Sequence, residues 1–201
     1  MKYTIVGLGN PGQEYEGTRH NTGRIVLDFI QGEMGEEYKF DKKLNANVVS
    51  GNIGTGKKAV KITLIAPDTF MNNSGKAVGQ IVKSKKAAEG LVVIYDDFNL
   101  PLGRMKISFN RSSGGHNGVE SIIKAVKTEG FVRIRIGTAP ETAKGDAKVP
   151  HGEEKIEKFI LGKFKEDEMK VLKKISKKAM EAVEMIVKEG REKAMSVFNG
   201  N

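Results

Sequence analysis

Residues 91–97 read Leu91-Val92-Val93-Ile94-Tyr95-Asp96-Asp97, an apolar run that ends in two acids. An apolar run without polar alternation is typical of a strand that is buried on both faces of a sheet, as in parallel sheets covered by helices. Ligand sites in such α/β proteins lie beyond the carboxyl ends of the strands. This stretch therefore predicts a central strand of an α/β fold and makes Asp96 a candidate site residue.

The rest of the chain alternates between strand and helix patterns. Strands are predicted at residues 3–6, 45–51, 58–66, 105–109 and 132–136, and helices at residues 23–34, 118–126 and 166–188. A further helix is expected to start with Ser74 as its N-cap, and residues 51–56 predict a hairpin turn. This alternation predicts one α/β domain over residues 1–201, with a twisted mixed β-sheet flanked by helices.

Two segments follow the last predicted strand. Residues 138–152 are rich in Pro, Gly and Thr and form the one long connector, so we expect a mobile loop there. Residues 166–198 are expected to form the C-terminal helices, the first of which carries one apolar stripe and stops at Gly190.

Composition narrows the classes of function. The 201 residues include no cysteine, which excludes disulfides, thiol nucleophiles and cysteine-ligated metals. Three histidines without carboxylates at a suitable spacing predict a site without metal. No apolar stretch approaches the ~20 residues that span a bilayer. A glycine loop follows the N-terminus so closely that it leaves no room for the apolar region of a signal peptide. We therefore expect a soluble, cytoplasmic protein without a membrane partner.

The basic charge of the chain is concentrated in one window. Residues 104–135 contain seven basic residues and two acidic ones, so they carry +5 of the net charge of +9. The window also contains Lys106, Arg135 and the pair His116-Asn117. A local excess of positive charge beside candidate site residues favours recognition of phosphate groups.

His20 is the candidate general base. It precedes Asn21 in the first glycine-rich segment, and Asn10 lies in the same segment. A carboxylate such as Asp96 on one ring nitrogen would fix the tautomer, and the other nitrogen could then deprotonate water. The chain lacks the Gly-x-Ser-x-Gly motif of serine esterases, so direct attack by water is the simpler route. The alternative is that His20 only bonds the backbone where a loop meets a helix.

Gly7-x-Gly9-x-x-Gly12 matches the dinucleotide-binding fingerprint in its letters but not in its context. That fingerprint requires a helix directly after the loop and a second strand that ends in an acid. Here Pro11 and residues 12–17 extend the loop, and Asp28 falls within a helical pattern. We therefore expect no cofactor, and a nucleotide-dependent oxidoreductase is disfavoured.

Two further polar segments have both a functional and a structural interpretation. In residues 70–75, Asn72 can present an amide to a carbonyl or a water while Phe70 and Met71 form an apolar wall, although the segment can also be a simple helix start. Residues 114–118 can be a plain turn before a helix, but backbone donors at a helix N-terminus also suit an anion or a nucleotide.

Together these segments resemble bacterial-type peptidyl-tRNA hydrolase, in the right order over essentially the whole chain. Several multi-residue motifs agree at once, which makes the match specific. The segments that carry the resemblance are Val6-Gly7-Leu8-Gly9-Asn10-Pro11-Gly12, Thr18-Arg19-His20-Asn21, Phe70-Met71-Asn72, Asp96-Asp97-Phe98, Gly114-Gly115-His116-Asn117-Gly118, Arg133-Ile134-Arg135-Ile136-Gly137 and Leu161-Gly162-Lys163-Phe164.

The resemblance implies hydrolysis of the ester that joins a peptide to the 3′ end of tRNA, which recycles tRNA from abortive translation. It implies a monomer without cofactor or metal, and a three-layer sandwich of the phosphorylase/hydrolase-like type. It also implies that residues 138–152, which depart from the family pattern, help to cover the cleft. The implied catalytic residues are His20 as base and Asp96 as its partner; the implied residues for peptide and tRNA are Asn10, Tyr15, Phe70, Met71, Asn72, His116, Asn117, Lys106 and Arg135.

The main alternative is a relative that binds RNA without hydrolysis, in RNA splicing or at the ribosome. Such a protein would share the basic window, so charge does not separate the two functions. The presence of His20, Asp96, Asn10 and Asn72 together favours the enzyme.

Overall fold

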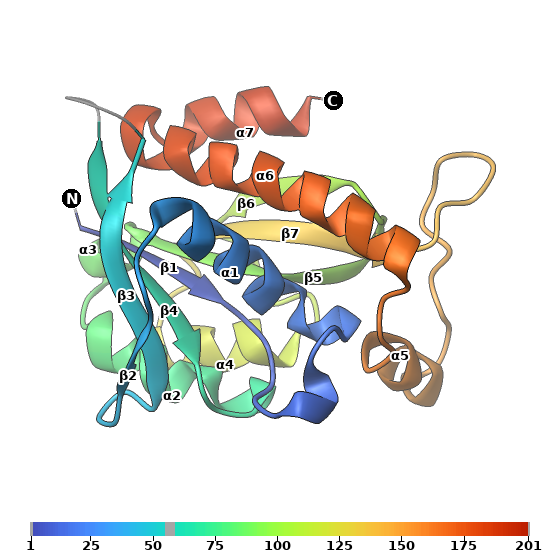
Figure 1. Ribbon diagram of the computed structural model, residues 1–201, viewed down its shortest axis with the longest axis horizontal. Coiled ribbons are helices and arrows are strands. Elements are labelled where there is room, and N and C mark those ends of the chain that lie inside the picture. The colour runs from blue at the N-terminus through green and yellow to red at the C-terminus, as the bar shows by residue number, and fades with distance from the viewer. Residues whose placement is uncertain (1, 55–58, 201) are drawn as a thin grey trace.

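The computed structural model describes residues 2–54 and 59–200, and within them seven strands form one mixed sheet (Figure 1). The order across the sheet is β2-β3-β4-β1-β5-β7-β6. The strands are β1 (Tyr3–Gly7), β2 (Lys39–Asp41), β3 (Ala46–Ile53), β4 (Val60–Pro67), β5 (Leu91–Pro101), β6 (Met105–Phe109) and β7 (Val132–Ala139).

The inner strands β4, β1, β5 and β7 are parallel, and β2, β3 and β6 are antiparallel to their neighbours. From β1 the chain first builds the side of the sheet that holds β2 to β4, and then passes β1 again to build the side that holds β5 to β7. The direction of strand addition thus reverses at β1. Open α/β sheets bind ligands in the crevice beyond the strand ends at such a reversal.

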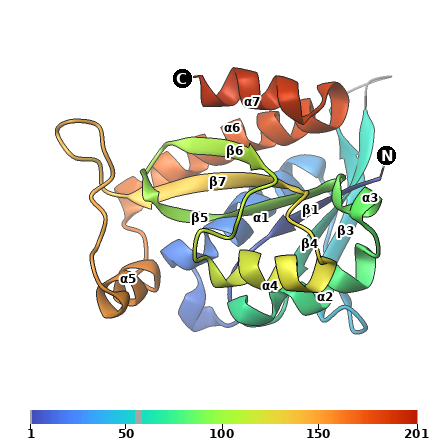
Figure 2. The same ribbon diagram turned by 180° about the vertical axis from the view of Figure 1, so that it is seen from behind.

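Helices cover both faces of the sheet (Figures 1 and 2). The first face carries α1 (Thr22–Met34), α6 (Glu166–Glu189) and α7 (Arg191–Asn199), and the second carries α2 (Ser74–Ile81), α3 (Lys85–Ala88) and α4 (Asn117–Val126). Short 3-10 turns precede two of the helices: η1 (Gln13–Tyr15) and η2 (Arg19–Asn21) before α1, and η4 (Met71–Asn73) before α2. The remaining helix, α5 (Glu153–Ile160), stands beside the sheet rather than on it.

β5 is buried on both faces, as its apolar run predicts. Val92 and Ile94 pack into the core under α1, α6 and α7. Leu91, Val93 and Tyr95 pack into the core under α2 and α4. Burying each large apolar side chain contributes about 1.5–3 kcal/mol, so the strand is held firmly from both sides. The middle of the strand, where the apolar run ends, therefore presents Asp96 from a rigid support.

Two glycines let α1 approach the sheet closely. A Cβ atom added at Gly7 would lie 2.4 Å from the carbonyl oxygen of Gly23, and one added at Gly23 would lie 2.2 Å from the carbonyl oxygen of Ile94. Real side chains do not tolerate such distances. This contact brings the start of α1, and the η2 turn that carries His20, to the end of β1 and the middle of β5.

The helices and strands predicted from periodicity are present, with boundaries that differ by a few residues. Only short elements were missed: β2, α3 and α5 each have eight residues or fewer. β5 continues past the apolar run to Pro101. Residues 55 and 56 of the predicted turn and residue 58 of the predicted strand lie outside the described residues.

The predicted role of Ser74 as an N-cap is wrong. Asn73 occupies the N-cap position, and Ser74 is the first residue of α2. The Ser74 hydroxyl is turned back and donates to the carbonyl of Met71 at 2.9 Å. The η4 turn continues directly into the helix, so the usual capping bond from Ser74 is replaced by this backward bond.

The predicted loop over residues 138–152 is wrong at its start. β7 continues through Ala139, because the carbonyl of Ala139 accepts a bond from Leu102 N–H at 2.7 Å. Residues 140–152 are irregular apart from a bridge between Glu141 and Ala147. Among residues 2–54 and 59–200, no helix has both the length and the apolar composition to cross a membrane.

Candidate active site

A cleft of about 1320 Å³ lies beyond the C-terminal end of β1 and over the second half of β5, and residues of β6 and β7 also line it. α4 and α5 contribute to its walls, and each segment quoted for the resemblance contributes at least one residue to its lining. The eleven residues predicted for catalysis or substrate binding all line this cleft: Asn10, Tyr15, His20, Phe70, Met71, Asn72, Asp96, Lys106, His116, Asn117 and Arg135.

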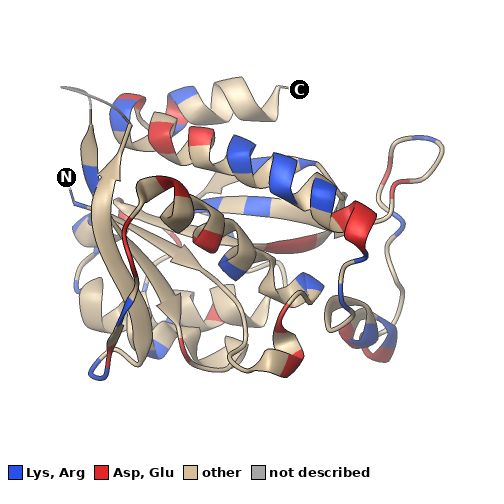
Figure 3. Ribbon diagram, viewed as in Figure 1, with Lys and Arg blue, Asp and Glu red and all other residues tan. Residues whose placement is uncertain are grey.

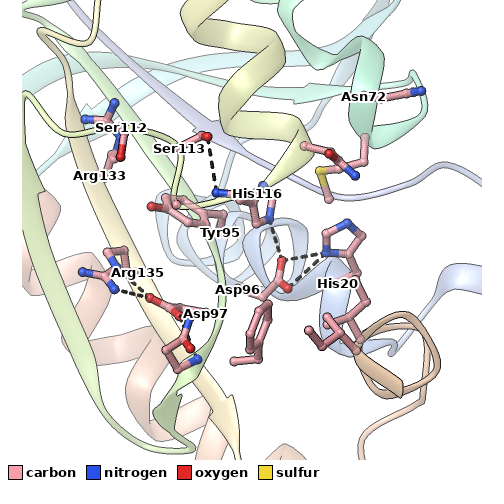
Figure 4. A pocket seen from close by; sticks show the side chains of 18 of the residues that line it. His20, Asn72, Tyr95, Asp96, Asp97, Ser112, Ser113, His116, Arg133 and Arg135 are labelled. Carbon is pink, nitrogen blue, oxygen red and sulfur yellow. Dashed lines mark hydrogen bonds and ion pairs between the residues drawn. The ribbon is translucent and has the colours of Figure 1, made fainter. Parts of the chain in front are cut away.

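His20 and Asp96 form a buried pair at the centre of the cleft (Figure 4). His20 Nδ1 lies 3.0 and 3.1 Å from the two carboxylate oxygens of Asp96. Asp96 is 2% exposed and His20 is 8% exposed. Since Nδ1 faces the carboxylate, the other ring nitrogen, Nε2, is left toward the cleft. This is the geometry of a histidine that is oriented to accept a proton from water.

The surroundings change the acidity of both groups. Burial alone would lower the pKa of His20, but the charge of Asp96 and its hydrogen bond raise that pKa above the ordinary value. Burial alone would raise the pKa of Asp96, but the two neighbouring histidines hold it well below the usual range for a carboxyl group. Asp96 is therefore ionised at neutral pH, and His20 is a stronger base than an isolated imidazole.

His116 is a second partner of Asp96. Its Nε2 atom lies 3.0 Å from Asp96 Oδ1, and its Nδ1 atom accepts the N–H of Val119 at 3.4 Å. The neutral ring therefore carries its proton on Nε2 and donates it to the carboxylate. Figure 4 shows His20 and His116 approaching Asp96 from two sides. From the sequence we predicted only substrate contact for His116. The residues around it do not indicate that the start of α4 places this imidazole beside Asp96 on β5.

Asn10 is held rigidly by its neighbours. Its backbone N–H donates to Asn21 Oδ1 at 2.8 Å, and Asn21 Nδ2 donates back to the Asn10 carbonyl at 2.9 Å. The side-chain Oδ1 of Asn10 accepts the N–H of Met71 at 2.8 Å. Because the oxygen is used in this way, the Nδ2 group is the part of the amide that remains to donate into the cleft.

The other predicted side chains lie at the rim. Asn72 and Asn117 are exposed, at the η4 turn and at the first position of α4. Tyr15 and Phe70 meet edge to face with ring centroids 6.3 Å apart, and Phe70 is 56% exposed. Met71 is buried below them. The rim thus offers apolar rings and two exposed amides.

One basic side of the cleft is formed by β6 and β7. Lys106 on β6 lies directly opposite Arg135 on β7 in the sheet register, so both side chains point to the same face. Lys106 is exposed, whereas the Arg135 guanidinium is 2.6 Å from the carboxylate of Asp97. Asp97 thus fixes Arg135 and offsets part of its charge. The sequence did not predict this ion pair, although Asp97 stands beside Asp96 in the opening run.

Several residues of the cleft were not predicted. Arg133 is fully buried, and its Nη1 donates to the carbonyls of Glu129 and Phe131 at 3.2 Å. Arg133 is one of the basic residues of the window 104–135, but the sequence did not predict that its side chain is buried. α5 contributes a further wall, and that helix was not predicted from the sequence.

His20, Asp96 and His116 are also the one group among the described residues whose ligand atoms could converge on a metal ion, since those atoms lie within 4.8 Å of one another. In the arrangement seen here, however, each of the two imidazoles directs a ring nitrogen at Asp96 at hydrogen-bond distance. The proton on His116 Nε2 occupies the lone pair that a metal would need. The donor set thus fits a hydrogen-bonded triad better than a metal centre.

Comparisons with known proteins agree over the whole chain. The family model described as peptidyl-tRNA hydrolase matches residues 4–201. The chain is 42% identical over 199 residues to the peptidyl-tRNA hydrolase of Thermoanaerobacter sp. (strain X514), covering 98% of this chain and 100% of the relative. It is 40% identical over 196 residues to that of Aquifex aeolicus (strain VF5), covering 97% and 95%. The crystal structure of peptidyl-tRNA hydrolase from Acinetobacter baumannii matches with a TM-score of 0.85 at 29% identity, covering 98% of this chain and 94% of that chain.

Proposed function

Because this chain belongs to the peptidyl-tRNA hydrolase family, we propose that it hydrolyses the ester between a peptide and the 3′ end of tRNA and so recycles the tRNA. The observation that carries this proposal is the His20–Asp96 pair in the cleft, with His20 Nδ1 held 3.0 Å from the carboxylate. An ester releases an alcohol, which needs less assistance than an amine. One oriented base and one water are therefore sufficient for the reaction.

In the proposed mechanism His20 Nε2 takes a proton from a water, whose oxygen attacks the ester carbonyl. Asp96 stabilises the imidazolium that forms, without taking its proton. The tetrahedral intermediate then collapses, and the bond between the carbonyl carbon and the tRNA ribose oxygen breaks. His20 returns the proton to that oxygen, so the products are a peptide carboxylic acid, which ionises at neutral pH, and a tRNA with a free 3′-terminal ribose.

The charge on the intermediate requires a donor, and we assign this role to Asn10 Nδ2. Its amide oxygen is already bonded to Met71 N–H, which fixes the orientation of the group before substrate arrives. A donor that is oriented in advance stabilises the oxyanion without reorganisation, which is commonly the largest electrostatic contribution to such reactions. Asn72 and Asn117 are more exposed, and we assign them to the peptide and to the terminal nucleotide.

The remaining predicted residues divide between the two ends of the substrate. Tyr15, Phe70 and Met71 would contact the peptide through apolar surface. Lys106 and Arg135, opposite each other on β6 and β7, would contact phosphates of the acceptor stem. Phosphate contacts position a nucleic acid without reading its sequence, which suits an enzyme that must accept many tRNAs.

We further propose that the reaction uses no metal, that the chain acts as a monomer, and that it works in the cytoplasm, where translation supplies peptidyl-tRNA. The hydrogen bonds that tie His20 and His116 to Asp96 support the first point. The presence of all eleven predicted residues in the cleft of one chain supports the second.

The test of the function is to compare a tRNA charged with an N-acetylated amino acid with the same tRNA charged with the free amino acid. We expect the purified protein to deacylate the N-acetylated substrate and to leave the free aminoacyl-tRNA largely intact. Activity should persist after treatment with EDTA. Binding of the N-acetylated substrate without any deacylation would instead support the RNA-binding alternative.

A further inference from the structure

α5 forms a wall of the cleft but is barely attached to the body of the protein. Ile156 and Ile160 line the cleft, yet no residue of α5 is buried. The helix follows the irregular residues 140–152 and begins after Gly152, whose φ of 92° is left-handed. Figures 1 and 2 both show α5 standing apart from the sheet and the other helices. What holds this wall in place must therefore be found at its C-terminal end.

Arg19, the residue before His20, holds that end. Its Nη2 atom donates to both carboxylate oxygens of Glu168, at 2.8 and 2.9 Å. Its Nη1 atom donates to the carbonyls of Gly162 and Lys163, at 3.2 and 3.0 Å. The guanidinium also lies over the rings of Phe159, at 4.8 Å, and Phe164, at 5.1 Å. One side chain thus ties the last turn of α5 and the first turn of α6 to the turn that carries the base.

Backbone bonds reinforce this connection. Arg19 N–H donates to the Gly162 carbonyl at 3.0 Å, and Phe164 N–H donates to the Gly17 carbonyl at 2.9 Å. These two bonds flank Thr18 and Lys163, which form an antiparallel bridge. The chain beside His20 is therefore directly paired with the chain that leaves α5.

We propose that Arg19 is a positioning residue that anchors α5 at one end and thereby sets the distance between this wall and His20. The proposal rests on the proposed function, because the substrate that α5 would hold is the peptide of peptidyl-tRNA. The planar fork of arginine is needed, since it binds a carboxylate, two carbonyls and two aromatic rings at once, which a lysine ammonium does not do. His20 itself is held by Asp96, so loss of the anchor affects the wall more than the base.

Glu168→Gln is the variant that tests this role. The glutamine keeps an oxygen that can accept the N–H of Lys165, the N-cap residue of α6, but it loses the bidentate ion pair with Arg19. Glu166→Gln is the matched control, because Glu166 is exposed in the same helical turn and forms no ion pair among the described residues. In Glu168→Gln we expect KM for N-acetylaminoacyl-tRNA to rise about tenfold, with kcat within about twofold of the parent. The acid limb of the pH profile should not move.

Hydrogen exchange provides a readout that does not depend on activity. In Glu168→Gln the amides of residues 153–160 should exchange faster than in the parent and in Glu166→Gln, while those of β5 should not change. If the amides of α5 exchanged at the same rate in Glu168→Gln and in the parent, the anchoring role of Arg19 would be refuted, whether or not the parent hydrolyses peptidyl-tRNA. An inactive parent with faster exchange in the variant would instead refute the proposed function and leave the anchor standing.

A disulfide can replace the anchor, since the chain has no cysteine of its own. The bonds around Thr18 and Lys163 make them a non-hydrogen-bonded antiparallel pair, with Cα atoms about 4.5 Å apart, which a disulfide can span. In Glu168→Gln with Thr18→Cys and Lys163→Cys, oxidation should restore KM and the slow exchange of α5, and reduction should reverse both. Failure of the oxidised protein to recover either property, with the disulfide verified by mass, would contradict the proposal.

Discussion

Asp96 is the residue on which the other site groups depend. It is 2% exposed and carries a charge, which is costly unless the charge is paired and hydrogen-bonded. His20 and His116 both supply such bonds, and each ring has its orientation fixed in return. The sequence predicted Asp96 and His20 because an acid ended a buried strand and a scarce histidine lay among amides. It did not predict the bond from His116, since that bond depends on how α4 approaches β5.

The raised pKa of His20 predicts a particular pH dependence. Since only the neutral imidazole accepts a proton, kcat/KM should rise with pH through a pKa above the ordinary value of about 6.5 and then level off. Asp96→Asn removes the charge that raises this pKa and leaves the burial that lowers it. The acid limb should therefore move to lower pH while the plateau falls. Profiles of both proteins on N-acetylaminoacyl-tRNA would check this, and a limb that stays in place or moves up would contradict it.

Among the elements, α1 shows how packing places chemistry. The sequence predicted this helix from its apolar spacing, but the spacing does not reveal how close the helix lies to the sheet. Gly7 and Gly23 determine that distance, because a Cβ on either would meet backbone at 2.2–2.4 Å. The short elements β2 and α5 escaped prediction for a different reason. Three strand residues are too few to show a period. In α5 the residues Ile156, Phe159 and Ile160 do stand at helical spacing, but the helix has only eight residues and was not predicted.

Gly23→Ala tests this contact, with Gly32→Ala as the control in the same helix. The new methyl at position 23 would meet the Ile94 carbonyl and the backbone of Leu8, so we expect a loss of about 2 kcal/mol or more in the free energy of unfolding. Gly32 has no neighbour within 4 Å and lies inside α1, so alanine should stabilise the protein by about 0.5–1 kcal/mol. Urea unfolding would measure both. Equal stability of the two variants would mean that α1 does not rest on the sheet in this way.

At the scale of the whole molecule, the cleft brings together segments that are far apart in the chain. The residues come from the loop after β1, from the second half of β5, from β6, β7 and α5, and from the turns that lead into α1, α2 and α4. Alternating patterns and the parallel run at β5 were enough to predict the fold class. Periodicity alone did not predict that these segments converge on one cleft. The resemblance to one family did predict it. Side-chain partners such as Asp97 for Arg135, and Glu168 for Arg19, follow from three-dimensional packing and were not foreseen.

The positive charge of the molecule does not by itself identify the substrate. Figure 3 shows Lys and Arg on many elements, including a group on α6, one of the helices that cover the first face of the sheet. The basic window of residues 104–135 includes Arg133, which is buried, and Arg135, which is paired with Asp97. Net charge thus supports an anionic partner, while the oriented pair of His20 and Asp96 gives the site its chemistry.

The most direct measurement is the single-turnover rate of ester cleavage by His20→Ala, with saturating enzyme and N-acetylaminoacyl-tRNA. Loss of the base should slow cleavage by about 100-fold to 10,000-fold, while binding of the substrate stays within a few-fold of the parent. A cleavage rate in His20→Ala comparable to that of the parent would contradict the assignment of His20 as the general base.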